Sequence, residues 1–139
     1  MKEIIARCGF ICNRCQAYRE NVKNDADRQR VSKSWRKFYG LQLAADQIYC
    51  DGCLKPDSEN PRRITQDCPF RKCTQQKGIP NCAYCHDYPC ERLEKQMSGC
   101  ESVELEWRGK YSAVEYRDFF SPYGARKTLG RIRKSVKKN

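Results

Sequence analysis

The sequence contains eleven cysteines, several of them in pairs separated by two residues, and these are its clearest candidates for chemistry. Cys12 and Cys15 form one such pair, and Cys50 and Cys53 form another. In this arrangement, a knuckle, both sulfurs can face one metal ion, and two knuckles complete a tetrahedral shell of four thiolates. Gly52, inside the second knuckle, permits a tight turn close to the ion. The spacing predicts one ion shared by these four cysteines, unless each knuckle completes a different site.

Five more cysteines lie between residues 68 and 90. Five sulfurs exceed one tetrahedral shell, so one of them must bridge, stay free or join the first group. We favour Cys73, Cys82, Cys85 and Cys90 as ligands of a second ion. Cys68 and Cys8 are then spares that could each replace one of these ligands, and the isolated Cys100 is expected to be a free thiol. With Cys68 included, the predicted metal ligands are Cys12, Cys15, Cys50, Cys53, Cys68, Cys73, Cys82, Cys85 and Cys90.

Zinc is the expected metal, at about two ions per chain, and an iron–sulfur cluster is the alternative. The closely spaced cysteine run of ferredoxins is absent, and cysteines confined to turns suit a structural ion. Cys8, Cys12 and Cys15 have the spacing of radical enzymes that use S-adenosylmethionine, but the chain is too short for the barrel of those enzymes. Cys82 to His86 spells a haem-attachment signal, but that attachment requires export. His86 is either a ligand in place of one cysteine or a surface residue.

The length and composition favour a single domain stapled by metal. Without the cysteines, the 139 residues supply few apolar side chains, so apolar burial alone would give a weak core. The N-terminus has no apolar run long enough for a secretion signal, and no segment is long enough to cross a bilayer. We therefore expect a cytoplasmic protein whose odd number of cysteines binds metal rather than forming disulfides.

Between the cysteine motifs the sequence predicts helices. Val31, Trp35 and Phe38 follow the spacing of one helix face, within a helix expected at residues 26–39. Further helices are expected at residues 69–77, at 91–97 with its end at Ser98-Gly99, at 113–120, and from about residue 125.

The expected fold is small and mainly α, with irregular metal-bound loops and room for short β-hairpins at the knuckles. Within this single metal-stapled domain, residues 1–100 are expected to form the cysteine-rich metal-binding part. Residues 101–139 are expected to form a basic helical extension packed on it.

The C-terminal segment reads as an amphipathic, cationic helix. Leu129, Ile132 and Val136 share one face. The remaining surface is basic, with Arg126, Lys127, Arg131, Arg133, Lys134, Lys137 and Lys138. The pattern favours a helix that packs through its apolar face and keeps its basic face in water; contact with nucleic acid or with a membrane surface is the alternative.

Four motifs in succession resemble one known family. They are Cys-Gly-x2-Cys-x2-Cys-x-Ala-Tyr at residues 8–18, Ile-Tyr-Cys-Asp-Gly-Cys at 48–53, Cys-x4-Cys-x3-Lys-Gly-Ile at 68–79, and Cys-x2-Cys-x-Asp-Tyr-Pro-Cys-Glu-x-Leu at 82–93. The sequence is similar here to bacterial and archaeal cysteine-rich proteins classed as domain of unknown function 3795. The resemblance implies a metal-binding fold and implies no activity.

Two functions compete on this evidence. The leading hypothesis is a zinc-stabilised binding module whose partner, nucleic acid or an acidic protein, contacts the basic C-terminal helix. The alternative is an iron–sulfur, thiol-redox or metal-handling protein, in which Arg7 and Arg14 would lower the pKa of Cys8 and make it reactive. The sequence gives no support for an enzyme, because catalytic zinc sites usually carry histidine or carboxylate ligands and this chain has one histidine.

Overall fold

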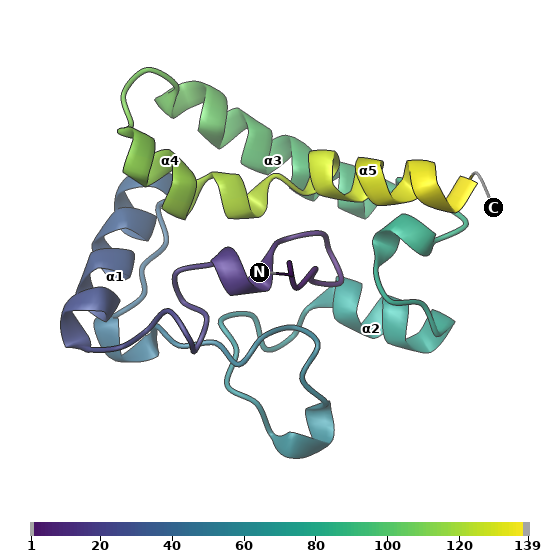
Figure 1. Ribbon diagram of the computed structural model, residues 1–139, viewed down its shortest axis with the longest axis horizontal. Coiled ribbons are helices and arrows are strands. Elements are labelled where there is room, and N and C mark those ends of the chain that lie inside the picture. Colours follow the sequence, from purple (N-terminus) through teal and green to yellow (C-terminus); the bar gives the residue numbers. More distant parts are fainter. Residues whose placement is uncertain (1, 138–139) are drawn as a thin grey trace.

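The computed structural model describes residues 2–137. Within them the chain forms the helices α1 (Asp25–Tyr39), α2 (Pro69–Lys77), α3 (Glu91–Trp107), α4 (Ala113–Phe119) and α5 (Ala125–Lys137). Helices α3 and α5 run side by side along one edge, α1 and α2 lie at opposite ends, and the N-terminal loop lies between them (Figure 1). The expected small, mainly helical single domain is confirmed.

The β-hairpins for which the knuckles left room do not form in the part of the chain that the structure describes. Only isolated bridges occur there, an antiparallel one between Ile5 and Ile11 and a parallel one between Tyr18 and Cys50. At the first of them, the amide of Cys12 donates to the carbonyl of Ile4 at 2.8 Å. The knuckles are therefore turns without strands.

Helix α1 begins and ends where local signals allow. The side chain of Asn24 caps the helix by accepting from the amide of Asp27 at 2.9 Å. Gly40 ends it in the left-handed conformation, with φ of 70°. Val31 and Trp35 lie on the buried face. The helix predicted at residues 26–39 is therefore confirmed, as are the predictions for α2, α4 and the start of α5.

Helix α3 is longer than the sequence predicted. It continues through Gly99 and ends at Trp107, so the expected end at residue 97 is wrong. A glycine inside a helix costs about 1 kcal/mol. Packing outweighs this cost, because Trp107 meets the ring of Phe38 edge-on with the centroids 5.1 Å apart. The predicted division of the chain after residue 100 thus falls inside a helix.

Two groups of buried side chains make up the interior. The aromatic core joins α1, α3 and α4 through Trp35, Phe38, Trp107, Phe119 and Phe120. The cysteine core joins the N-terminal loop to α2, α3 and α5, and its members include Cys8, Cys12, Cys82, Phe70, Leu93, Met97 and Leu129. The thin supply of apolar residues is thus divided between two clusters, and one of them includes several thiols.

Helix α5 packs against the first cysteine loop. Leu129 is fully buried, and a Cβ atom added to Gly9 would lie 2.5 Å from its Cγ atom. Gly9 also has φ of +98°, which side chains rarely adopt. Ile132 packs on the same cluster. The apolar face of α5 therefore packs as predicted.

Much of the basic face of α5 is engaged within the protein. Arg126 pairs with Glu94 and Glu101 of α3, at 2.8 Å in each case. Arg133 donates to the carbonyls of Ala83 and Cys85 at 3.0 and 2.8 Å. Lys127 and Lys134 stay exposed, whereas the side chain of Lys137 and all of Lys138 lie outside the described residues.

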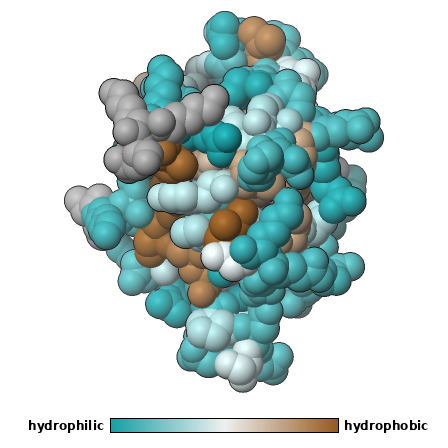
Figure 2. All heavy atoms as spheres, turned by 90° about the vertical axis from the view of Figure 1, so that its right-hand side faces the viewer, coloured by the Kyte–Doolittle hydropathy of each residue, from teal (hydrophilic) through white to brown (hydrophobic). Residues whose placement is uncertain are grey.

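The outer surface is mostly polar. From the end formed by α2 and the last turns of α5, hydrophilic residues dominate and hydrophobic ones show between them (Figure 2). Among residues 2–137, none of the helices is both long enough and apolar enough to cross a membrane.

Replacing Gly9 tests the contact between the first loop and α5. Gly9→Ala should lower the free energy of unfolding by about 2–4 kcal/mol, because the methyl group meets Leu129 and the backbone conformation disfavours it. Urea denaturation would measure the change. Gly40→Ala is the matched control: it also has positive φ, but its added Cβ meets no described atom within 4 Å, so only about 1 kcal/mol should be lost. Equal losses in both variants would contradict the proposed contact.

Candidate metal centres

All eleven cysteines are free thiols, and together they line two cavities. The seven-cysteine cavity has a volume of about 480 Å³ and is lined by Cys8, Cys12, Cys15, Cys50, Cys53, Cys68 and Cys100. The four-cysteine cavity has a volume of about 560 Å³ and is lined by Cys73, Cys82, Cys85 and Cys90. Each of the two predicted sets of four ligands thus lies in one cavity. Whether either set binds metal stays a prediction.

The first knuckle is shaped by a short 3-10 turn, η1 (Cys12–Arg14). The amide of Cys15 donates to the carbonyl of Cys12 at 3.1 Å, which closes the turn. The side chain of Asn13 accepts from the amide of Ile4 at 2.9 Å and so ties the preceding segment of the chain to the turn. Both knuckle cysteines therefore face the seven-cysteine cavity from a turn, the position at which such pairs commonly bind metal.

Hydrogen-bond donors point at several of these sulfurs. Nearby backbone N–H groups lower the pKa of Cys8, Cys12 and Cys15, although burial outweighs them; for Cys12 the group is that of Cys53. The hydroxyl of Tyr123 also lies 3.1 Å from the sulfur of Cys15. Donors of this kind stabilise a thiolate relative to a thiol. The surroundings thus suit sulfurs that carry negative charge when a cation is bound.

Burial opposes the ionisation of several of these thiols. Burial raises the pKa of Cys8, Cys12 and Cys82 to about 12. The expectation that Arg7 and Arg14 lower the pKa of Cys8 is wrong. The guanidinium of Arg7 donates instead to the carbonyls of Ile79 and Pro80, at 2.9 and 3.1 Å, and that of Arg14 pairs with Glu3 at 3.4 Å. A reactive thiolate at Cys8 therefore has no support in the structure.

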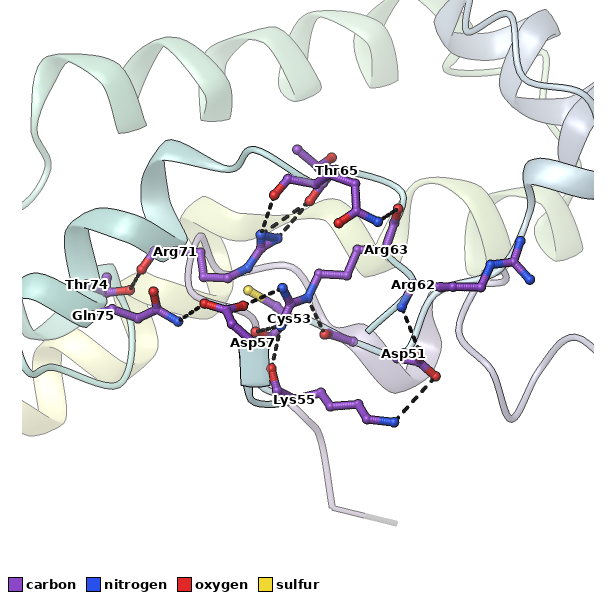
Figure 3. A network of polar contacts seen from close by, with 12 residues as sticks. Asp51, Cys53, Lys55, Asp57, Arg62, Arg63, Thr65, Arg71, Thr74 and Gln75 are labelled. Carbon is purple, nitrogen blue, oxygen red and sulfur yellow. Dashed lines mark hydrogen bonds and ion pairs between the residues drawn. The ribbon is translucent and has the colours of Figure 1, made fainter. Parts of the chain in front are cut away.

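A buried arginine organises the second knuckle (Figure 3). The side chain of Arg63 is only 5% exposed, and it donates to the carbonyl of Gly52 at 3.0 Å and to that of Lys55. Its other terminal nitrogen pairs with Asp57 at 2.8 Å. Gly52 itself has φ of +99° and lies against the ring of Tyr18, where a Cβ would sit 3.1 Å from a ring carbon. The position of Cys53 thus depends on Arg63.

A second arginine holds the segment that leads into α2. The guanidinium of Arg71 donates to the carbonyl of Thr65 at 2.8 Å and is also buried. Arg63 and Arg71 both line the seven-cysteine cavity. Sequence reasoning missed both, because nothing in their spacing distinguishes them among 28 lysines and arginines.

The four-cysteine cavity is built from a helix, a turn and the start of a second helix. Cys73 lies in the middle of α2, Cys82 begins the turn η4 (Cys82–Tyr84) and Cys85 follows it, and Cys90 precedes the first residue of α3. A helix N-terminus favours a thiolate through its exposed N–H groups. The ammonium of Lys77 donates to the sulfur of Cys85 at 3.1 Å. Lys77 thus places a positive charge beside these sulfurs.

The structure places Cys68, Cys100 and His86, which the sequence assigned to neither predicted set of four ligands. Cys68 lines the seven-cysteine cavity but also packs in one cluster with Cys82 and Cys90, so it lies close to both groups of cysteines. Cys100 lines the same cavity although it stands apart in sequence. His86 is fully exposed and lines neither cavity, as expected of a surface residue.

The donors fit zinc in type, but their arrangement is not preformed. Among residues 2–137, no group of three or more Cys, His, Asp or Glu side chains is placed to hold a metal ion as the side chains stand. Thiols are the ligands that structural zinc sites favour, and each cavity supplies at least four of them. Binding would therefore require the sulfurs to turn towards a common point.

Comparison with known proteins gives one match. The model of a family described as "Protein of unknown function (DUF3795)" matches residues 4–95. No curated protein and no solved structure matches the chain. The matched segment contains every cysteine except Cys100, and it ends within the first two turns of α3.

Replacing Arg63 tests its role at the second knuckle. Arg63→Met should lower the free energy of unfolding by about 2–4 kcal/mol, because several carbonyls and Asp57 lose a charged donor. It should also speed amide hydrogen exchange around Cys53. Arg62→Met serves as the control, since Arg62 is exposed, and it should change stability by less than about 1 kcal/mol. Equal effects of the two substitutions would refute the special role of Arg63.

Proposed function

The chain belongs to the family described as "Protein of unknown function (DUF3795)", and we propose that it is a zinc-binding protein in which both cysteine-lined cavities hold metal. One observation carries the proposal: all eleven cysteines gather around two cavities, and each cavity receives one complete set of four predicted ligands. Within the first set, Cys12 and Cys53 are 41 positions apart in the sequence. The fold, and not their spacing along the chain, therefore brings them to one cavity.

The metal would act chiefly on stability. Each Zn²⁺ displaces the protons of its thiols and ties loops that are neither helices nor strands, so binding energy becomes folding energy. The two apolar cores are small, and the cysteine core depends on thiols whose sulfurs a metal would link. Thiol ligands also need a reducing environment, so we place the protein in the cytoplasm.

A stabilised scaffold of this kind would serve as a binding module. The formal net charge is +11, and eight thiolates with two zinc ions would lower it by four, to about +7. The protein would thus stay basic when loaded and would suit a polyanion, nucleic acid or an acidic protein. Lys127 and Lys134 on α5 are exposed, whereas Arg126 and Arg133 are engaged internally, so the available basic face is narrower than the sequence suggests.

An iron–sulfur cluster is the second candidate for the metal. The seven-cysteine cavity favours it, because four thiolates at one cavity also suit a cluster and the cavity has sulfurs to spare. Thiol-redox chemistry without metal has less support, since burial raises the pKa of Cys8, Cys12 and Cys82.

Metal analysis of protein purified without oxygen tests the metal proposal. We expect at least two zinc ions per chain and no visible absorption. Cys85→Ser should remove zinc from the four-cysteine cavity and Cys15→Ser from the seven-cysteine cavity, each with a loss of stability. Cys100→Ser is the control and should keep the full content. Iron with sulfide and a brown absorption band would establish the cluster instead, and protein that folds and binds no metal would refute both candidates.

The partner proposal is tested separately by binding to a labelled single-stranded oligonucleotide. Affinity should fall steeply with salt, since phosphate contacts release counterions. The double variant Lys127→Gln/Lys134→Gln should weaken binding and reduce the salt slope by about 1–2. Lys33→Gln/Arg36→Gln on α1 removes the same charge elsewhere and is the control. No binding at low salt would exclude nucleic acid and leave an acidic protein as the partner class.

A further inference from the structure

The last helix reaches the fourth cysteine motif. The end of α5 lies beside the turn η4 of that motif (Figure 1). The guanidinium of Arg133 donates to the carbonyls of Ala83 and Cys85, at 3.0 and 2.8 Å. It also lies over the ring of Tyr88, 5.5 Å from the ring centroid. One side chain of α5 thus contacts three residues of the segment that carries Cys82 and Cys85.

The turn that Arg133 contacts is buried and irregular. Ala83 is fully buried, so water does not reach its carbonyl. Within the turn, the amide of Cys85 donates to the carbonyl of Cys82 at 3.1 Å, and the amide of Tyr88 donates to that of Cys85 at 3.2 Å. A buried carbonyl that lacks a donor costs free energy. Arg133 supplies a charged donor to the carbonyl of Ala83 and a second donor to that of Cys85.

Helix α5 holds Arg133 in place. Leu129, one helical turn before Arg133, is fully buried and lies against Gly9. Ile132 packs on the cysteine core, and Arg126 pairs with two glutamates of α3. The guanidinium of Arg133 therefore extends from a helix that is itself fixed on two sides, and it can hold the turn in one conformation.

Arg133 is placed differently from the arginines near it on α5. Arg126 and Arg131 pair with glutamates, and the side chain of Arg131 is exposed. The Nε atom of Arg133, by contrast, is buried and has no hydrogen-bond partner among residues 2–137. A guanidinium offsets such a loss of hydration only where its other nitrogens gain good partners. The placement of Arg133 thus favours a role at the turn over a role at the surface.

We propose that Arg133 is a positioning residue for the thiols of Cys82 and Cys85, and that α5 is therefore part of the candidate site. Arg133 fixes the backbone of the turn, and the turn places both cysteines at the four-cysteine cavity, which they line. The family match ends at residue 95, before α5 begins, so this contribution comes from outside the matched segment. The consequence for metal rests on the proposed zinc binding: a turn held in one conformation would release zinc more slowly than a mobile one.

Hydrogen exchange of the full chain tests the positioning role and does not require metal. Arg133→Met keeps an apolar stem and removes the guanidinium. Exchange at the amides of Cys85 and Tyr88 should then accelerate roughly 10- to 100-fold, the effect of losing hydrogen bonds from a charged donor. Alkylation of Cys82 and Cys85, measured by mass spectrometry with a zinc chelator present, should accelerate as well, because both residues are buried until the turn opens.

Two comparisons show whether the effect is local. Arg131→Met is the matched control, since it removes the same charge from the exposed side of α5, and it should leave exchange in residues 82–88 unchanged. In Arg133→Met, exchange at the amide of Cys15 in the first motif should change by less than about twofold, whereas a general loss of stability would accelerate exchange at both motifs. Arg133→Lys keeps a charged donor and should give a smaller increase at residues 82–88. It carries the test if Arg133→Met does not fold.

The outcomes separate the positioning role from the proposed zinc binding. Equal exchange at residues 82–88 in the variants of Arg133 and in Arg131→Met would overturn the positioning role, as would an increase spread evenly over the chain. Release of zinc to a coloured chelator should be faster for part of the bound metal in Arg133→Met, and an unchanged rate would overturn the consequence for metal. Protein that binds no zinc, and in which Arg133→Met still accelerates local exchange, would refute zinc binding and support the positioning role.

Discussion

The buried N-terminal loop imposes the constraint on which the rest of the structure depends. Residues 4–15 lie at the centre of the molecule (Figure 1) and, apart from the short turn η1, form no helix and no strand, so many of their backbone polar groups need other partners. Some of these partners come from distant segments: the amide of Ile11 donates to the carbonyl of Pro122, and the amide of Cys82 donates to that of Arg7, both at 2.9 Å. These bonds bring the C-terminal segment and the fourth cysteine motif to the first motif. The cysteine cavities follow from this convergence.

The aromatic core and the cysteine core stabilise different parts of the molecule. Around Phe38, rings from α1, α3 and α4 pack edge-on, and this aromatic core sets the angle between the helices. The cysteine core covers the loop itself, with Leu129 of α5 packed directly over Gly9. Apolar contacts thus stabilise the helical frame, while the loops depend on thiols and on hydrogen bonds to their backbone. The proposed metal ions would complement such loops, since they would link sulfurs that packing leaves apart.

Buried arginines complete this arrangement and connect it to the proposed centres. Arg63 satisfies carbonyls of the turn that carries Cys53, and Arg71 does the same for the segment before Cys68. A buried guanidinium needs such partners to offset its loss of hydration. Both groups also place positive charge at a cavity whose sulfurs would become thiolates on metal binding. Arg63 and Arg71 therefore stabilise the backbone around the cavity and would also favour thiolates inside it.

Local signals in the sequence determined the helices and the grouping of the cysteine pairs. Gly40 and Gly78 end α1 and α2 in the left-handed backbone conformation, which glycine adopts easily. A single residue type therefore predicts each of these helix ends. The same reasoning failed at Gly99, where the contact between Trp107 and Phe38 decides that the helix continues. Only the tertiary structure decided that Cys8 and Cys68 share a cavity with the first two knuckles, and that Arg63, Arg71 and Arg133 serve the interior rather than a partner. Spacing along the chain limits which groups can meet, but long-range packing selects which of them do.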